Sequence, residues 1–255
     1  MAQFFTNFSE YTTDETPTGW TSRWVAPTSF LVVADGAATG GKVLRIVKEQ
    51  ARSLLSFDAI NGDANRDNIE VLLRCRATTI SEATTQIGVA ARASGAATSE
   101  NGYRGNFSTA TQLAQGKYVS GASTPLGNAV KSWTVDTWHW LRFQCTGTTV
   151  RSKSWTGAIS SEPGSWDISA TDSDISAAGW AGVFMFGAST YDVDLIGVGT
   201  GGDSAPSEAP ASSSETVEPA NATHAHVATS PTIGPAPSVP RRIVVQRRVA
   251  GVWTP

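Results

Sequence analysis

The side chains that could catalyse a reaction are few and poorly placed for it. Hydrolysis of a glycosidic bond needs two carboxylates, one acting as the acid and the other as the nucleophile or base. A Glu-x-Asp-x-x-Glu cluster on a strand would supply them, and the sequence contains none. The nearest pair is Asp192 and Asp194, placed where a last-strand carboxylate commonly orders a turn. We therefore expect that the protein is not an enzyme.

Nucleophilic chemistry is not expected either. Cys75 and Cys145 fall on the apolar faces of two alternating segments, where a free cysteine behaves as a small hydrophobic residue. His139 shares the parity of Leu141 and Phe143. The sequence thus predicts a structural histidine in the core and two thiols.

Oxygen-bearing side chains gather around an Asn-Gly pair between residues 58 and 67. The five residues are Asp58, Asn61, Asp63, Asn65 and Asp67. Oxygen ligands of this kind suit Ca²⁺, although the spacing does not match an EF-hand. The same residues are typical of a solvated β-turn, and both interpretations stay open. His224 and His226 could place two imidazoles on one side of an extended chain, but a metal site would need further ligands. No other cofactor is expected.

Carbohydrate binding needs an exposed aromatic ring beside groups that form hydrogen bonds. Five residues are candidates for such a site: Tyr103, Arg104, Tyr118, Trp166 and Asp167. For other tryptophans we expect packing in the core or at its rim, namely Trp138, Trp140, Trp155 and Trp180.

Period-two patterns predict the strands that must position these residues. Ile69, Val71, Leu73 and Cys75 alternate with polar residues, and the segment 138–145 alternates in the same way. Further strands are expected at 42–47, 86–91, 102–108, 149–155, 180–186 and 191–198. Many short strands with Gly-rich turns and almost no helical periodicity predict an all-β fold, a two-sheet antiparallel jelly-roll sandwich.

The aromatic residues mark where the folded part ends. Of the 22 Phe, Trp and Tyr residues, all but Trp253 lie at or before Tyr191. Large aromatic residues dominate core burial, so we expect one jelly-roll domain over residues 1–202. Residues 203–240 hold seven of the 12 prolines and no Lys, Arg or aromatic residue, which predicts an extended linker.

The last segment, residues 241–255, is apolar and basic and is expected to form a strand-like docking arm with a turn at Ala250 and Gly251. Its notable residues are Arg241, Arg242, Ile243, Val245, Arg247, Arg248 and Trp253. The arm is too short for a core of its own. Pairing with the edge of a neighbouring sheet would suit its β-branched run, and we expect it to bind another subunit or another copy of the chain.

Charge and composition exclude several other classes of protein. The net charge of −3 gives no reason to expect binding to nucleic acid. No apolar run approaches the roughly 18 residues that span a bilayer, so no membrane insertion is expected. The first eight residues lack the basic and apolar regions of a signal peptide. With two cysteines only, we expect synthesis in a reducing cytosol.

Four segments of the chain carry a resemblance to known proteins: residues 138–155, 161–166, 167–184 and 191–206. Over about residues 65–206 the chain resembles the concanavalin A-like lectin/glucanase jelly rolls, of laminin-G-like type, found in structural proteins of tailed phages and prophages. Residues 222–233, which include His224 and His226, are similar to a short His-containing repeat of phage appendage proteins.

The resemblance implies a virion surface protein, either a head decoration or a component of the tail or a fibre. It would be made in the host cytoplasm, attach to other virion proteins through the arm, and adhere to surface polysaccharide with many weak sites. Self-association into a homo-oligomer is expected. The resemblance also favours a structural use of Trp155 and Trp166. One alternative is a purely structural cement or baseplate protein; another is an envelope-degrading enzyme, which would need the missing carboxylate pair.

Overall fold

The chain divides into two compact units, Met1–Ser212 and Ser213–Pro255. The computed structural model describes residues 2–49, 51–78, 85–108 and 111–210, and the backbone of residues 247–249 and 252–254. In the second unit β16 (Arg247–Val249) and β17 (Val252–Thr254) pair antiparallel around residues 250–251, where the sequence predicts a turn. The predicted arm residues Arg241, Arg242, Ile243 and Val245, like His224 and His226, lie outside the described residues.

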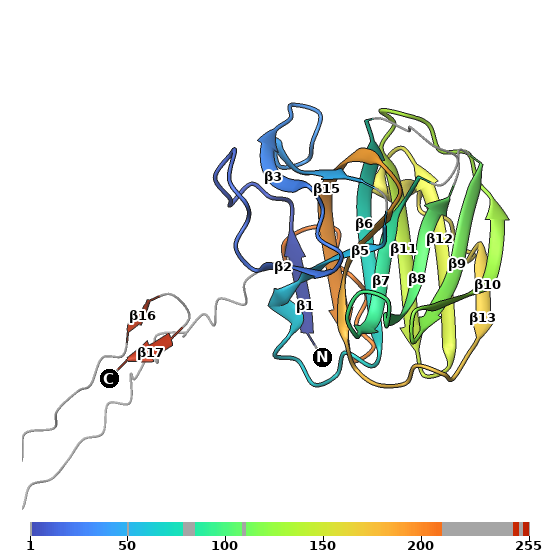
Figure 1. The fold of residues 1–255 in the computed structure, drawn as a ribbon. Helices are drawn as coiled ribbons and strands as arrows, with labels where there is room; N and C mark the ends of the chain where they lie inside the picture. The colour runs from blue at the N-terminus through green and yellow to red at the C-terminus, as the bar shows by residue number, and fades with distance from the viewer. Residues whose placement is uncertain are drawn as a thin grey trace, which may run out of the picture. The chain divides into compact units, whose positions relative to one another are not determined.

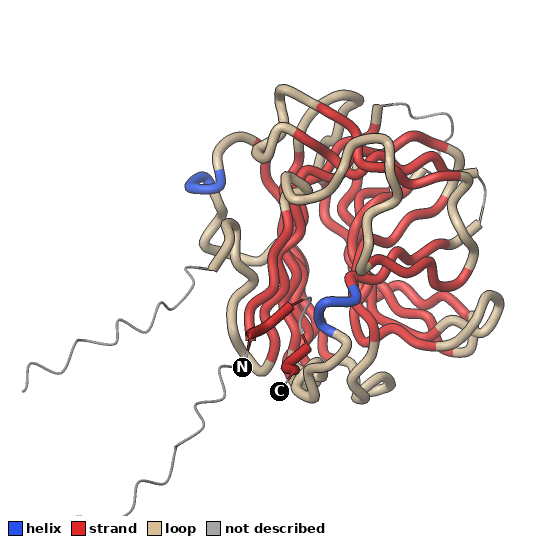
Figure 2. Tube along the Cα trace, turned by 90° about the vertical axis from the view of Figure 1, so that its left-hand side faces the viewer, coloured by secondary structure: helices blue, strands red, loops and turns tan. Residues whose placement is uncertain are grey.

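The first unit consists of two antiparallel sheets that pack face to face (Figures 1 and 2). The eight-stranded sheet has the order β13 (Ile168–Thr171), β12 (Thr149–Thr156), β11 (His139–Thr146), β6 (Ile69–Ala77), β15 (Ser189–Thr200), β4 (Lys42–Lys48) and β3 (Ser29–Ala34), with β1 (Ala2–Thr6) also paired to β15. The seven-stranded sheet has the order β10 (Ala122–Val130), β9 (Gln112–Val119), β8 (Asn101–Ser108), β7 (Gln86–Ser94), β14 (Trp180–Phe186), β5 (Ser53–Phe57) and β2 (Trp20–Trp24). The predicted all-β antiparallel sandwich is confirmed.

Helix is confined to two short 3₁₀ turns in the described residues, η1 (Asp58–Ile60) and η2 (Ile159–Ser161). No helix among the described residues is long and apolar enough to cross a membrane.

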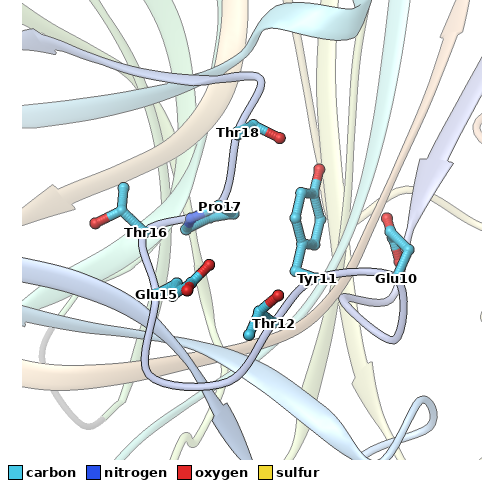
Figure 3. A pocket seen from close by; sticks show the side chains of 7 residues that line it. All are labelled: Glu10, Tyr11, Thr12, Glu15, Thr16, Pro17 and Thr18. Atoms are coloured by element: carbon cyan, nitrogen blue, oxygen red, sulfur yellow. The ribbon is translucent and has the colours of Figure 1, made fainter. Parts of the chain in front are cut away.

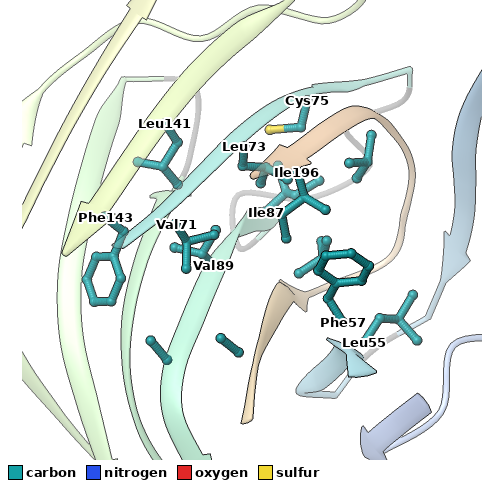
Figure 4. Packing of buried hydrophobic residues seen from close by; sticks show 14 of the residues in the cluster. Leu55, Phe57, Val71, Leu73, Cys75, Ile87, Val89, Leu141, Phe143 and Ile196 are labelled. Atoms are coloured by element: carbon teal, nitrogen blue, oxygen red, sulfur yellow. The ribbon is translucent and has the colours of Figure 1, made fainter. Parts of the chain in front are cut away.

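Strand alternation places the core between the sheets. Ile69, Val71, Leu73 and Cys75 of β6 all belong to the main cluster of buried residues, as the period-two pattern predicts. Figure 4 shows Val71, Leu73 and Cys75 in one layer with side chains of β7, β11 and β15. Because successive residues of a strand point to opposite faces, the residues between them form the outer surfaces of the two sheets.

The chain leaves the sandwich along the outer face of the eight-stranded sheet. Leu72 points outward from β6 and packs there with Trp140, Trp155, Leu195 and Ala205. The rings of Trp140 and Trp155 are stacked, with centroids 5.8 Å apart. We call residues 203–206 the exit segment. Since its Ala205 is buried, packing continues past residue 202, where the aromatic distribution predicts the start of the linker.

Two glycines of β15 let the exit segment lie directly on the sheet. A Cβ atom at Gly197 would overlap the carbonyl oxygen of Pro206, and one at Gly199 would overlap that of Asp203. Hydrogen bonds complete the attachment: the Ala205 amide donates to Glu70 Oε1 at 3.1 Å, and Gln3 Nε2 donates to the Ser204 carbonyl at 2.9 Å.

We expect Gly197→Ala to destabilise the sandwich, because the added methyl group must displace the exit segment. Overpacking of this kind costs about 1–3 kcal/mol. Urea unfolding followed by tryptophan fluorescence measures the change. Gly164→Ala is the matched control, since a Cβ atom there meets nothing within 4 Å. If both variants unfold at the same urea concentration, the exit segment is not held against β15.

Candidate functional site

The five residues predicted to bind carbohydrate do not form one site. Tyr103 points into the core between the sheets, whereas Tyr118 belongs to a separate cluster on the outer face of the seven-stranded sheet, next to Arg104. Trp166 and Asp167 lie between η2 and β13, beside the eight-stranded sheet. Tyr103 and Arg104 are neighbours on one strand and so face opposite sides of the sheet.

Tyr103 is a core residue, and the prediction of an exposed ring is wrong. Its side chain is fully buried, and its hydroxyl donates to Asp172 Oδ1 at 2.6 Å and accepts from the Ile175 amide at 3.1 Å. Burial, together with the hydrogen bond to Asp172, raises the pKa of the phenol to about 12. The tyrosine therefore fastens the loop before β14 to the inner side of β8.

Arg104 and Tyr118 belong to an arginine–aromatic face on the outer side of the seven-stranded sheet. We use this name for the residues Arg23, Trp24, Arg52, Arg104, Tyr118, Trp180, Phe184 and Phe186. Tyr118 and Phe184 form its buried floor, and Trp24 meets both rings edge-on at 6.0 and 6.3 Å. Trp24, Trp180 and Phe186 are partly buried at its margin, which agrees with the rim position expected for Trp180.

Small residues leave room for these long side chains. Gly88 and Ala90 of β7 and Gly182 of β14 alternate with core residues, so they occupy outward positions of the sheet. A Cβ atom at Gly182 would overlap the carbonyl oxygen of Leu55 on the next strand. The long side chains of the arginine–aromatic face therefore cover the backbone at these small residues of the central strands.

Each of the three arginines stacks on a ring, but their ionic partners differ. The Arg23 guanidinium lies 4.4 Å from the Trp180 ring and 3.5 Å from Asp58. The Arg52 guanidinium lies 4.4 Å from the Tyr118 ring, 3.4 Å from Glu100 and 2.7 Å from the Gly121 carbonyl oxygen.

Arg104 has a different environment. Its guanidinium lies 5.2 Å from the Tyr118 ring and 5.6 Å from the Phe184 ring. It donates to Asn106 Oδ1 and to Ser123 Oγ, the latter at 3.5 Å. It makes no ion pair with any residue that the structure describes.

A pocket of about 390 Å³ adjoins the arginine–aromatic face at Arg52 and Phe186. Its lining residues are Val25, Ala51, Arg52, Ala97, Thr98, Glu100, Gly121 and Phe186. The combination of exposed ring edges, guanidinium donors and a neighbouring hollow is suited to a sugar, which offers an apolar face and hydroxyl groups.

Trp166 and Asp167 are directed to different partners near the eight-stranded sheet. Arg151 and Lys153 lie over the Trp166 ring, at 4.5 and 5.0 Å from its centroid. Asp167 pairs with Lys131 at 2.9 Å and accepts from the Ser154 amide at 2.9 Å. Trp166 borders a pocket of about 270 Å³ that also contains Glu70, Arg142 and Glu162.

The two carboxylates of the Trp166 pocket, Glu70 and Glu162, are paired with cations. Glu70 and Glu162 both pair with Arg142, and Lys153 lies 2.7 Å from Glu162. Burial opposes ionisation of Glu162, but the hydrogen bonds and charges of Arg142 and Lys153 outweigh it and lower the pKa of this carboxyl. A general acid in hydrolysis needs the opposite shift, because it must hold a proton near neutral pH.

Asp192 and Asp194 likewise form ion pairs with arginines. Both carboxylates are completely buried. Asp192 lies 2.8 Å from Arg45 and 2.8 Å from Arg76, and Asp194 pairs with Arg74. The arginine side chains thus hold these two carboxylates on the outer side of the central strands.

Oxygen-bearing side chains of the loop at residues 58–67 form hydrogen bonds that are typical of a turn. Asp58 accepts from Ser56 Oγ at 2.7 Å and Asn61 Nδ2 at 3.0 Å, and Asp63 accepts from the Asn65 amide at 2.8 Å. Within the loop Asn61 accepts from Arg66, and Asp67 accepts from Asn68. Among the described residues no three acidic, histidine or cysteine side chains are grouped as metal ligands. The Ca²⁺ site expected from Asp58, Asn61, Asp63, Asn65 and Asp67 stays a prediction.

Sequence analysis did not identify a polar pocket in the loop between β1 and β2. Figure 3 shows its lining, which includes Glu10, Tyr11, Glu15 and Pro17, around a volume of about 170 Å³. Burial is the main cause that raises the pKa of Tyr11. The residues are close in sequence but follow no strand or helix period, so no pattern signalled them.

The residues predicted to be inert are confirmed as core residues. Cys75 and Cys145 are fully buried free thiols, and burial raises the pKa of both, that of Cys145 to about 12. His139 packs on Phe107 at 5.1 Å and Trp133 at 6.4 Å between ring centroids.

The two-sheet antiparallel jelly-roll fold is shared with several solved structures. Among solved structures, the chain is similar to the carbohydrate-binding module CBM66 from Bacillus subtilis. The two are 17% identical over 70% of this chain and 95% of that module, with a TM-score of 0.50.

Two further solved structures share the fold. A protein of unknown function from Shewanella oneidensis MR-1 is 15% identical over 77% of this chain and 85% of its own, with a TM-score of 0.54. The transglycosylase Crh5 is 10% identical over 79% of this chain and 85% of its own, with a TM-score of 0.50. No protein-family model matches the chain, and no curated protein matches it in sequence.

We expect acidification to destabilise the sandwich through His139. Burial lowers the pKa of this imidazole to about 4 from the ordinary value of 6.5. Between these pH values the unfolded chain binds a proton that the folded chain excludes, so stability falls as the pH drops through this interval. The full effect is about 3 kcal/mol, since one pKa unit corresponds to about 1.4 kcal/mol.

Urea unfolding at pH 7.0 and at about pH 4.5 measures this loss, and His139→Gln should reduce the difference between the two. A double variant, His224→Gln with His226→Gln, is the control, because both positions lie outside the sandwich unit. An unchanged pH dependence in His139→Gln would assign the effect to other groups.

Proposed function

We propose that the chain is a non-enzymatic glycan-binding protein that uses the arginine–aromatic face. The observation that carries this proposal is the set of partly exposed rings of Trp24, Trp180 and Phe186 around guanidinium groups and a pocket. The fold shared with a Bacillus subtilis carbohydrate-binding module supports it.

The pairing of the carboxylates supports a role without catalysis. Glu162, the acid of the Trp166 pocket with a shifted pKa, is stabilised in its ionised form. Asp192 and Asp194 are each locked by arginine. Since a glycosidase needs one protonated and one ionised carboxyl at the bond to be cleaved, this arrangement suits binding alone.

We further propose that the protein is a virion surface component, a head decoration or part of a tail or fibre. The resemblance of about residues 65–206 to jelly rolls of tailed-phage and prophage proteins supports this role, as does the His-containing segment at 222–233. The basic segment 241–255 would attach the sandwich to another virion protein or to further copies of the chain. Many copies on one particle would turn weak glycan contacts into firm adhesion.

A purely structural cement or baseplate protein is the second candidate. The complete or near-complete burial of Tyr118 and Phe184 favours it, because rings that only support the sheet need no ligand.

Removal of the exposed rings distinguishes these two candidates. Trp24→Ala combined with Trp180→Ala should weaken glycan binding at least tenfold, a change of about 1.4 kcal/mol. The measurement is a glycan-array screen of the full chain followed by titration with the best ligand. Trp166→Ala, in the loop beside the other sheet, is the control and should leave affinity unchanged. Loss of binding in the control alone would move the site to Trp166, and no binding by the unaltered protein would favour the structural role.

Deletion of residues 241–255 tests the attachment. We expect the shortened protein to bind glycan as before but to lose self-association or incorporation into particles, since the arm lies outside the sandwich unit. Sedimentation velocity and particle occupancy report the two losses. Full occupancy by the shortened protein would contradict the proposed role of the arm.

A further inference from the structure

We propose that Arg104 binds the carboxylate of an acidic sugar, so that the arginine–aromatic face selects acidic over neutral glycans. This inference rests on the proposed glycan-binding function and specifies the class of its ligand. It starts from a guanidinium whose hydrogen-bonding and charge requirements are only partly met within the described residues.

The guanidinium N–H groups of Arg104 have few hydrogen-bond acceptors for a partly buried arginine. A guanidinium has five N–H donors and normally finds a carboxylate or several carbonyl oxygens. Arg104 donates only to a side-chain amide oxygen and, at 3.5 Å, to the hydroxyl of Ser123, and its buried Nε has no partner. Arg92, which also lacks a carboxylate, instead donates to the carbonyl oxygens of Asp67, Ile175 and Gly147.

The charge of Arg104 is also unbalanced. Burial lowers the pKa of its guanidinium, the Tyr118 side chain offsets part of this effect, and the positive charge of Arg52 adds to it. Both guanidinium groups lie against the same tyrosine ring, Arg52 at 4.4 Å and Arg104 at 5.2 Å. Only Arg52 has a carboxylate nearby, Glu100. An anion beside Arg104 would therefore relieve both the desolvation cost and the repulsion.

The surroundings hold the guanidinium in one place and leave one side open. Asn106 is fully buried, and its amide donates to Gln86 Oε1 at 3.2 Å, which orients its oxygen toward Arg104. The guanidinium lies over Gly116, where a Cβ atom would come within 3.3 Å of Nη2. Nη2 donates to Ser123 on the adjoining strand, which is exposed, so this nitrogen is the one through which a ligand would approach the guanidinium.

An acidic sugar matches both parts of this environment. Its carboxylate can accept two parallel hydrogen bonds from an arginine, and its ring can lie against an aromatic side chain. The rings of Tyr118 and Phe184 that flank Arg104 are buried, whereas Trp24, which contacts both edge-on, is partly exposed and is the ring that a sugar could reach. The carboxylate could belong to a hexuronic acid or to a sialic acid, and the shared group is what Arg104 would recognise.

Titration calorimetry of the full chain tests this selectivity. The acidic ligands are an oligogalacturonide and sialyllactose, and their neutral counterparts are an oligogalactoside and lactose. We expect at least one acidic ligand to bind ten times or more tightly than its counterpart, with a preference that shrinks at high salt. The pair of ligands that shows the preference identifies whether the carboxylate belongs to a hexuronic acid or to a sialic acid.

Arg104→Met should abolish the preference while neutral ligands bind as before, and Arg104→Lys should restore only part of it, because lysine lacks the planar fork. Arg151→Met is the matched control: Arg151 also stacks on an aromatic ring, that of Trp166, and makes no ion pair with a described residue, but it lies on the other sheet. A thermal melt confirms that each variant is folded.

The outcomes separate the two proposals. Equal binding of acidic and neutral ligands would overturn the role of Arg104 and leave glycan binding intact. A preference that persists in Arg104→Met would overturn it as well. Failure of every ligand on the array and in solution to bind the unaltered protein would overturn both.

Discussion

Burial of one apolar face of every central strand constrains the rest of this molecule. Because strand side chains alternate, the choice of the inner residues also decides which residues cover the two outer faces. Val71 and Leu73 turn inward, and so Leu72 must turn outward, where Trp140 and Trp155 cover it. The same rule sends Tyr103 into the core and Arg104 to the surface. The arginine–aromatic face is thus a by-product of core formation that function can use.

The two outer faces manage arginine in different ways. On the eight-stranded sheet, Arg142 is matched by Glu70 and Glu162, and Arg76 is matched by Asp35 and Asp192. On the seven-stranded sheet, Arg23 and Arg52 are matched by Asp58 and Glu100, but Arg104 contacts only rings and uncharged side chains among the described residues. A ring attracts a cation but does not neutralise it. The outer face of the seven-stranded sheet can therefore still bind an anion, whereas most arginines on the eight-stranded sheet are already paired with carboxylates of the protein.

Alternation explains why much of the fold followed from sequence. The β6 and β11 patterns identified core residues, and the fate of Cys75, Cys145 and His139 followed from parity. Tyr103 and Arg104 are consecutive residues of one strand, so the same alternation places them on opposite faces of the sheet. The prediction of one shared site for both did not take this into account. Trp24, Arg52 and Phe184 could not be joined from sequence, because strands distant in the chain bring them together. Nor does composition show that an aspartate such as Asp63 accepts a hydrogen bond from Thr200, 137 residues further along the chain.

The exit segment has a mechanical consequence. Tension on the chain beyond residue 210 reaches the sandwich through Ala205, whose backbone is held by Glu70 and Arg142. Behind this latch lies β15, a strand bonded along one edge to β6 and along the other to β4 and β1. Peeling the segment away would absorb the first part of a pull. The force would then act on β15, which is hydrogen-bonded to neighbouring strands along both edges. The exit segment would therefore detach first and the sandwich would unfold only afterwards.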